Sequence, residues 1–146
     1  MGEKDTDPRM HTAEHILNRT MIELFGTNRC FNAHIEKKKS KCDYYFDKEL
    51  TDEELQQIED KVNEIIQQDL SVQEEYMDKE EARKRCYPAK IPDSSDSDIR
   101  VIKVGEYDLC PCIGPHVAST SELGNFKLVS ADLNDGVLRI RYKLSC

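Results

Sequence analysis

Two short segments that lie far apart in the sequence carry the side chains best suited to chemistry. His11 and His15 are four residues apart in His-Thr-Ala-Glu-His, a spacing that places side chains one above the other on a helix. Cys112 and His116 have the same spacing in a segment that contains glycine and proline. Imidazole nitrogens and a thiolate are ligands that Zn²⁺ prefers. The four residues therefore predict a zinc site, provided that the fold brings the two segments together.

Each pair taken alone is a weak indication of a metal site. A single histidine on the apolar face of a helix is more often a hydrogen-bonded core residue. The order His-Thr-Ala-Glu-His also differs from the His-Glu-x-x-His of zinc proteases, and we expect Glu14 to face solvent. Cys110 is a second thiol close to Cys112, but alternation along an extended chain would send it to the opposite face. We therefore interpret Cys110 as structural.

The charge of the chain limits how it can bind nucleic acid. With 21 Lys and Arg against 29 Asp and Glu in 146 residues, the formal net charge is −8, and the field of the whole molecule repels phosphate. A contact with RNA needs a local basic patch, such as a basic loop or a strand with alternating basic residues, although charge runs in loops are often simply solvated. The candidates for this contact are Lys37, Lys38, Lys39, Lys41, Arg139, Arg141 and Lys143.

The composition favours one folded domain over residues 1–146, with a flexible N-terminus over residues 1–8. Hydrophobic residues make up 38% and charged residues 34% of the chain, which is too apolar for a disordered protein. The sequence contains no apolar run of membrane-spanning length, and it begins with acidic residues where a signal peptide needs a basic start. We expect a cytoplasmic protein without membrane contact, whose six cysteines are free thiols or metal ligands.

Local signals predict three helices that would position these residues. Apolar residues at helical spacing over residues 11–25 are followed by Gly26, a typical helix stop. Thr51 and Glu54 form a capping box at the start of a second amphipathic helix, which extends to about residue 69. A third, short helix is expected over residues 79–85.

Segments rich in β-branched and aromatic residues predict six strands. They cover residues 30–35, 42–47, 72–77, 100–104, 126–133 and 137–144. Asn134-Asp135-Gly136 predicts a tight hairpin between the last two, and residues 92–98 are expected to form a solvated loop. The expected fold is α+β: a single domain with an antiparallel sheet backed by two long helices, and the zinc site between the first helix and the Cys-x-x-x-His turn.

Together these features resemble a known family. His-Thr-Ala-x-His at the head of a helix, a later Cys-x-x-x-His turn and a Glu-rich helix between them are similar to the editing domain of alanyl- and threonyl-tRNA synthetases, the second additional domain. The similarity is greatest to the small free-standing alanyl-tRNA editing proteins of the AlaX type, from about Pro8 to Leu144. The chain departs from the family in one turn, where it has Cys-Ile-Gly-Pro-His instead of the common Cys-Gly-Gly-Thr-His.

The resemblance implies a zinc ion held by His11, His15, Cys112 and His116, and hydrolysis of a wrongly charged tRNA in trans. If three residues bind zinc, the remaining position can hold the attacking water, and no other catalytic group is assigned. His116 is then either a fourth ligand or a residue beside the substrate. The expected substrate is seryl-tRNA(Ala). The alternatives are glycyl-tRNA(Ala), seryl-tRNA(Thr), or a catalytically silent binding module that zinc stabilises.

Three further residues are candidates for recognising the amino acid. Thr12 is adjacent to the first histidine, and by the resemblance Asn32 and His34 lie on a strand that borders the pocket. The Asn32 amide could hydrogen-bond a serine hydroxyl. Asn32 and His34 could equally be ordinary residues of an edge strand. The expected partner is the acceptor end of a misacylated tRNA, and the sequence leaves the oligomeric state open.

Overall fold

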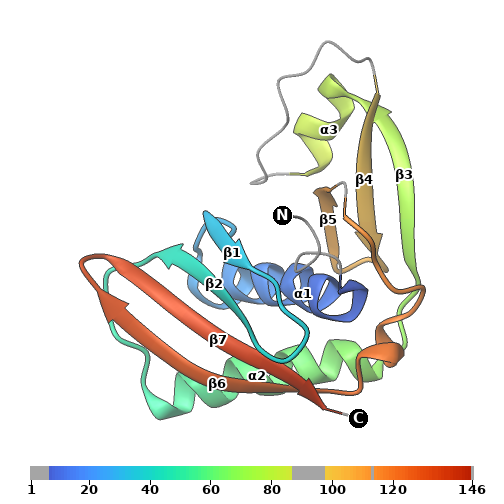
Figure 1. Cartoon of the computed structure of the whole chain (residues 1–146). Coiled ribbons are helices and arrows are strands. Elements are labelled where there is room, and N and C mark those ends of the chain that lie inside the picture. The colour runs from blue at the N-terminus through green and yellow to red at the C-terminus, as the bar shows by residue number, and fades with distance from the viewer. Residues whose placement is uncertain (1–6, 87–97, 113, 146) are drawn as a thin grey trace.

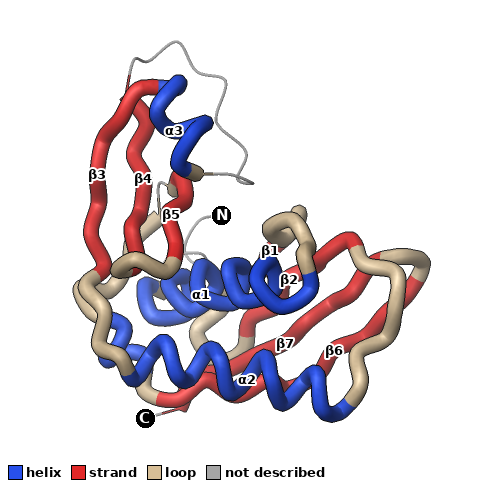
Figure 2. Tube along the Cα trace, turned by 180° about the vertical axis from the view of Figure 1, so that it is seen from behind, coloured by secondary structure: helices blue, strands red, loops and turns tan. Residues whose placement is uncertain are grey.

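The computed structural model describes residues 7–86, 98–112 and 114–145 of the chain. Within these residues two antiparallel sheets meet at helix α1 (Pro8–Phe25) (Figure 1). Figure 2 shows α1 and helix α2 (Asp52–Gln67) side by side on one face of the larger sheet. The smaller sheet carries the short helix α3 (Lys79–Arg85). The three predicted helices are thereby confirmed.

The boundaries of α1 follow from local chain chemistry. At its start, the Asp7 side chain accepts a hydrogen bond from the Met10 N–H at 2.9 Å, and Pro8 occupies the first turn. At its end, Gly26 adopts a left-handed φ of 69° and its N–H donates to the Ile22 carbonyl. The helix therefore begins before the predicted range, and it includes the last residue of the N-terminus that was expected to be flexible.

Helix α2 begins at the predicted capping box. The Glu54 N–H donates to Thr51 Oγ1 at 3.1 Å, and the Thr51 N–H donates to Glu54 Oε1 at 2.9 Å. The apolar face of the helix is buried against the larger sheet through Ile58, Val62, Ile65 and Ile66.

The larger sheet has the strand order β1-β2-β7-β6. Its strands are β1 (Asn32–His34), β2 (Ser40–Tyr45), β6 (Asn125–Asn134) and β7 (Val137–Ser145). The last two form the predicted hairpin, because Asn134 pairs with Val137 and the two loop residues, Asp135 and Gly136, have φ values of 52° and 77°.

The main core lies between this sheet and the two long helices. Most of its side chains come from α1, α2, β2, β6 and β7, and all are nearly inaccessible to solvent. Its largest buried members are Tyr44, Tyr142, Phe126, Met10, Ile16, Leu17, Met21, Ile58, Ile66, Leu123 and Leu138. This core fixes the face of α1 that points toward the sheet and so determines where His11 and His15 point.

The smaller sheet was not predicted, and the expectation of a single sheet was wrong. Strands β3 (Val72–Asp78), β4 (Asp98–Val104) and β5 (Asp108–Pro111) pair in that order. They pair with one another rather than with the larger sheet, and with α3 they enclose a second small core. Strand β5 was not predicted, because its sequence Asp-Leu-Cys-Pro contains no β-branched or aromatic residue.

Some predicted features lie outside the described residues. These are residues 1–6 of the N-terminus, residues 92–97 of the solvated loop, and Cys146. The five described cysteines are free thiols. In the described part of the chain, no helix combines the length and the apolar character needed to cross a bilayer.

Candidate metal centre and the adjoining cavity

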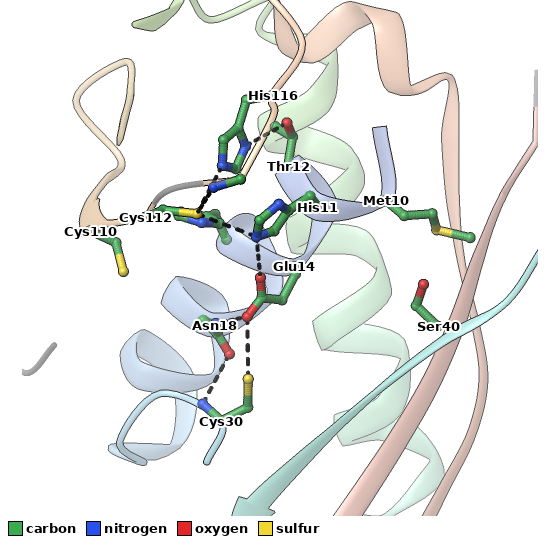
Figure 3. Close-up of polar contacts among 12 residues, drawn as sticks. Met10, His11, Thr12, Glu14, Asn18, Cys30, Ser40, Cys110, Cys112 and His116 are labelled. Carbon is green, nitrogen blue, oxygen red and sulfur yellow. Dashed lines mark hydrogen bonds and ion pairs between the residues drawn. The ribbon is translucent and has the colours of Figure 1, made fainter. Parts of the chain in front are cut away.

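The four predicted zinc ligands converge on one point. His11 and His15 come from α1, whereas Cys112 and His116 come from the segment after β5, and one donor atom from each residue lies within 4.8 Å of the others. His11 Nε2 and His116 Nε2 are each 3.4 Å from Cys112 Sγ. Figure 3 shows the two imidazoles pointing toward the sulfur.

These separations fit a tetrahedral zinc site. Zinc binds sulfur at about 2.3 Å and imidazole nitrogen at about 2.0–2.1 Å, so a nitrogen and a sulfur on one tetrahedral zinc are about 3.5 Å apart. The N–S distances of 3.4 Å on His11 and His116 are close to this value. The donor set of three imidazoles and one thiol is also one that Zn²⁺ favours.

The environment of Cys112 stabilises the thiolate, which is the form that binds metals. Burial raises the pKa of Cys112, but its close contacts with the side chains of His11, His116 and His15 lower it, to about 3. The Gly114 N–H also points toward the sulfur, at 3.4 Å. The centre is therefore set up to hold a negative sulfur beside a positive charge.

Thr12 determines which nitrogen of His116 faces the sulfur. Its hydroxyl donates to the Pro8 carbonyl at 2.8 Å, so its single hydrogen is already used. Thr12 Oγ1 lies 3.0 Å from His116 Nδ1 and also accepts from the Val117 N–H at 3.2 Å. His116 Nδ1 must therefore donate, which leaves the Nε2 lone pair free for a metal.

A buried ion pair supports His15 from behind. Asp108 Oδ2 is 3.5 Å from His15 Nδ1, and the Asp108 carboxylate also receives two hydrogen bonds from Arg29, at 2.8 and 2.7 Å. Burial lowers the pKa of His15, but contacts with Asp108 and Cys112 raise it, to about 9. A carboxylate behind a metal-ligating histidine is a common arrangement in zinc sites. Neither Asp108 nor Arg29 was predicted to belong to the site, because neither carries a local signal in the sequence.

Glu14 does not face solvent, contrary to the prediction. Its Oε1 lies 3.5 Å from His11 Nε2, and its Oε2 accepts hydrogen bonds from Asn18 Nδ2 at 3.1 Å and Cys30 Sγ at 3.4 Å. The side chain is only 14% exposed. Glu14 also lines the cavity described below, so it belongs to the centre (Figure 3).

The turn that carries Cys112 is held in place by its backbone. Arg100 Nη1 donates to the carbonyl oxygens of Cys112, at 2.8 Å, and Gly114, at 3.1 Å. A Cβ atom on Gly114 would lie 2.1 Å from His11 Cε1, so only glycine fits between the turn and the ring. The Cys110 thiol is not one of the four converging donors, and in Figure 3 it points away from them.

A cavity of about 620 Å³ opens beside the centre. His11, His15, Glu14 and Cys112 line one side of it. Residues of the segment before β1, Phe31 among them, and Tyr45 at the end of β2 also line it, together with Cys110 and Pro111 of β5. The cavity therefore lies between the two sheets, with three of the four candidate metal ligands in its wall.

The residues predicted to recognise the amino acid do not line this cavity. Thr12 is fully buried, and its hydroxyl is occupied by His116, Pro8 and Val117. Asn32 donates to Asp43 Oδ2 at 3.3 Å, and His34 forms an ion pair with Glu36. Between these two residues, Ala33 packs on the main core, so alternation along β1 points Asn32 and His34 away from the helices. Both fit the alternative of ordinary edge-strand residues.

The predicted tRNA contacts separate into two groups. Lys38, Lys39, Lys41 and Arg141 line a second depression of about 380 Å³ together with His34, Glu36 and Ser40, whereas Lys37, Arg139 and Lys143 do not.

Two of the predicted cations are paired within the sheet. Arg139 donates to both oxygens of Asp43, at 2.8 and 3.0 Å, and Arg141 donates to Asp132 at 3.1 Å. Much of the positive charge on β7 is therefore balanced by its neighbours.

The chain is similar in sequence to a domain of known aminoacyl-tRNA synthetases. Residues 99–141 match the sequence model of the threonyl and alanyl tRNA synthetase second additional domain. The chain is 37% identical over 138 residues to the alanine--tRNA ligase of Rickettsia massiliae, and 31% identical over 135 residues to that of Borreliella afzelii. The alanine--tRNA ligase of Ligilactobacillus salivarius is 36% identical over 132 residues.

These alignments include most of this chain but a small part of the relatives. They cover 89–91% of the chain and 15–23% of the Rickettsia massiliae and Borreliella afzelii proteins; for the Ligilactobacillus salivarius protein the shares are 89% and 15%. The chain therefore spans less than a quarter of the length of these relatives. The region that matches the family model contains Cys112 and His116, while His11 and His15 precede it.

Proposed function

Since this chain belongs to the family of threonyl and alanyl tRNA synthetase second additional domains, we propose that it hydrolyses the ester bond of misacylated tRNA in a zinc-dependent reaction, with seryl-tRNA(Ala) as substrate. The observation that carries the proposal is the convergence of His11, His15, Cys112 and His116 beside a cavity of about 620 Å³ that the first three of them line. Two distant segments supply these four donors, and the cavity beside them can hold the end of a substrate.

An enzyme of this kind would remove amino acids that a synthetase attaches to the wrong tRNA. A synthetic site built for alanine can exclude larger side chains by size. It separates substrates that differ by one small group by only about 1–3 kcal/mol, so serine and glycine are attached by mistake. A second, hydrolytic site removes the error. The cavity beside the candidate metal centre would receive the 3′ end of the tRNA with its wrong amino acid.

The four residues of the centre would bind zinc, and neighbouring side chains would hold these ligands in position. Zinc, when bound, supplies Lewis acidity that polarises a carbonyl and lowers the pKa of water toward about 7. Cys112 contributes a thiolate, Thr12 keeps the Nε2 lone pair of His116 available, and Asp108 orients His15. This support from outside the ligand set keeps the donor atoms in position.

Glu14 is placed to accept the proton that the attacking water loses. Its Oε1 is 3.5 Å from the metal-facing nitrogen of His11, and the carboxylate lies in the cavity wall. The hydrogen bonds from Asn18 and Cys30 to Oε2 fix the carboxylate so that Oε1 faces the centre. A positioned carboxylate of this kind contributes about 10²- to 10⁴-fold to a hydrolysis.

The tRNA body would bind through the lysines of the second depression. Lys38, Lys39 and Lys41 lie together there with Arg141, which gives a local basic patch on a chain of net charge −8. Binding to phosphates releases the cations condensed on the RNA, and this release is less favourable at higher salt concentration, so the affinity for tRNA should fall as salt rises. An affinity that does not change with salt contradicts this part of the proposal.

The second candidate function is a zinc-stabilised module that binds tRNA without hydrolysis. The observation that favours it is that the donor atoms of all four residues lie close enough together to bind one ion. If all four bind zinc at once, the ion is closed in the manner of a structural site. The two functions share the metal and the cavity and differ only in whether amino acid is released.

One experiment separates the candidates. Metal analysis of the purified protein should give about one zinc ion per chain. The variant His15→Ala should lose this ion. The control variant His34→Ala alters a histidine outside the donor group and should keep it. The same preparations are then tested for release of amino acid from seryl-tRNA(Ala), glycyl-tRNA(Ala), seryl-tRNA(Thr) and alanyl-tRNA(Ala). Release from the first but not the last supports editing. Bound zinc with release from none supports the binding module, and His15→Ala with full zinc and full activity contradicts both.

A further inference from the structure

We infer that Phe31 and Tyr45 form a stacking platform for the base of the 3′-terminal nucleotide of the substrate RNA. This inference rests on the proposed function and deepens it, because it assigns the part of the cavity that holds the nucleoside rather than the amino acid. The ligand class is a flat nucleobase on a single-stranded RNA end.

The two rings are already arranged as a stack. Their centroids are 4.0 Å apart and their planes are inclined by 14°. Phe31 is 46% and Tyr45 is 69% exposed, so they are among the few large hydrophobic residues that the described chain exposes to solvent. Exposed aromatic rings offer the π face on which the bases of single-stranded nucleic acids stack, whatever their sequence.

The strand pairing holds the rings in place. Tyr45 ends β2, and the Phe31 N–H donates to the Asp43 carbonyl at 2.9 Å just before β1 begins. The platform therefore sits on paired backbone, which limits the entropy lost when a base binds. Two rigid rings on a sheet edge suit the recognition of a planar group.

The platform lies in the same cavity as the candidate metal centre. Phe31 and Tyr45 line it together with His11, His15 and Cys112. A chain of contacts joins the two sides: Cys30, next to Phe31, donates to Glu14 at 3.4 Å, and Glu14 is 3.5 Å from His11.

The chemistry of the substrate requires two such subsites next to each other. In aminoacyl-tRNA the amino acid is esterified to the ribose that carries the terminal base, so one nucleotide must present its ester to the centre and its base to a nearby surface. The polar walls of the cavity near His11, Glu14 and Arg29 suit the ester and the amino group. The apolar platform suits the base, which gains from leaving water.

The test uses binding, so that it is independent of hydrolysis. The probe is a short RNA hairpin ending in CCA, in which an amide replaces the ester between serine and the terminal ribose; a matched probe lacks the terminal base. The zinc-loaded wild-type protein should bind the complete probe about 5- to 150-fold more tightly than the abasic one. The double variant Phe31→Leu, Tyr45→Leu keeps apolar side chains but removes the rings, and it should lose this preference.

A control variant and the deacylation assay complete the test. Tyr76→Leu removes another exposed tyrosine, 62% accessible, on β3 and outside the cavity, and it should keep the full preference for the complete probe. Equal binding of the two probes by the wild type, or an unchanged preference in the double variant, overturns the platform. If the wild type hydrolyses seryl-tRNA(Ala) but shows no preference for the base, the platform fails and the proposed function stands. If the wild type hydrolyses none of the charged tRNAs but prefers the complete probe, and the double variant does not, the platform stands and the proposed hydrolysis fails.

Discussion

The imidazole of His11 packs directly against the backbone of Gly114. A Cβ atom at position 114 would come within 2.1 Å of His11 Cε1 and 2.4 Å of His11 Nδ1. This contact joins the head of α1 to the turn that carries Cys112 and His116, and it sets how closely the two halves of the centre approach.

Gly114→Ala should therefore weaken zinc binding. The added methyl group must push His11 or the turn aside, and we expect an affinity about 10- to 100-fold lower, the range seen when surroundings of a metal ligand are disturbed. Competition with a chromophoric chelator measures this affinity. Gly26→Ala is the matched control: its Cβ meets nothing within 4 Å but its φ is +69°, so it should cost about 1 kcal/mol of stability and leave zinc affinity unchanged. Equal affinities for both variants would contradict the steric argument.

Asp108→Asn should damage both stability and metal binding. The substitution leaves the Arg29 guanidinium, 11% exposed, without its anionic partner, which costs about 3–5 kcal/mol for a buried pair. It also weakens the support of His15, and zinc affinity should fall about 10- to 100-fold. Urea unfolding and the chelator competition measure the two effects. Asp132→Asn removes the exposed partner of Arg141, and a loss of zinc affinity in that variant as well would show that the effect is not specific to the centre.

Thr12 should act through its hydroxyl group alone. Thr12→Val preserves the shape of the side chain but removes the oxygen that holds His116 Nδ1 and the Val117 N–H. Zinc should bind about 10- to 100-fold less tightly. Thr12→Ser retains the hydroxyl and should restore most of the affinity. If Thr12→Ser is as weak as Thr12→Val, packing of the methyl group rather than the hydrogen bonds supports the centre.

Glu14→Gln should separate proton transfer from metal binding. The amide keeps the size of the side chain and cannot accept the proton from water, so kcat for release of serine from seryl-tRNA(Ala) should fall about 10²- to 10⁴-fold, with KM and zinc content little changed. Glu64→Gln, on the exposed side of α2, provides the control and should have wild-type activity. A loss of zinc together with activity would show instead that Glu14 serves to position His11.

The Asp43–Arg139 pair should contribute stability that depends on pH. Hydrogen bonds from Arg139 lower the pKa of Asp43, with smaller contributions from Asn32 and Lys41. The folded-state pKa is thus below the unfolded value of about 3.9, so the contribution is fully present above that pH and is lost as the pH falls through the folded value. The difference in stability between wild type and Asp43→Asn should be constant near neutral pH and should shrink below about pH 4. Urea unfolding at a series of pH values measures it, and a difference that does not depend on pH would contradict the assignment.

Much of the fold could be predicted because the signals are local. The capping box of Thr51 and Glu54 forms as expected, since a helix cap depends on residues within one turn. The hairpin at Asp135 and Gly136 follows from residues that accept a positive φ. The smaller sheet could not be predicted, because strand partners depend on long-range packing that no short window contains.

The sequence by itself determined the four donors and the spacing that aligns each pair, because residues four apart in one helix or one turn are neighbours however the rest of the chain folds. Only the tertiary structure decided the surroundings of the donors. It turned Glu14 into the cavity, placed Asp108 and Arg29 behind His15, and pointed Asn32 and His34 away from the centre. The physical reason is that strand register and the burial of α1 choose which side of each element faces inward, and these depend on contacts between residues far apart in the chain.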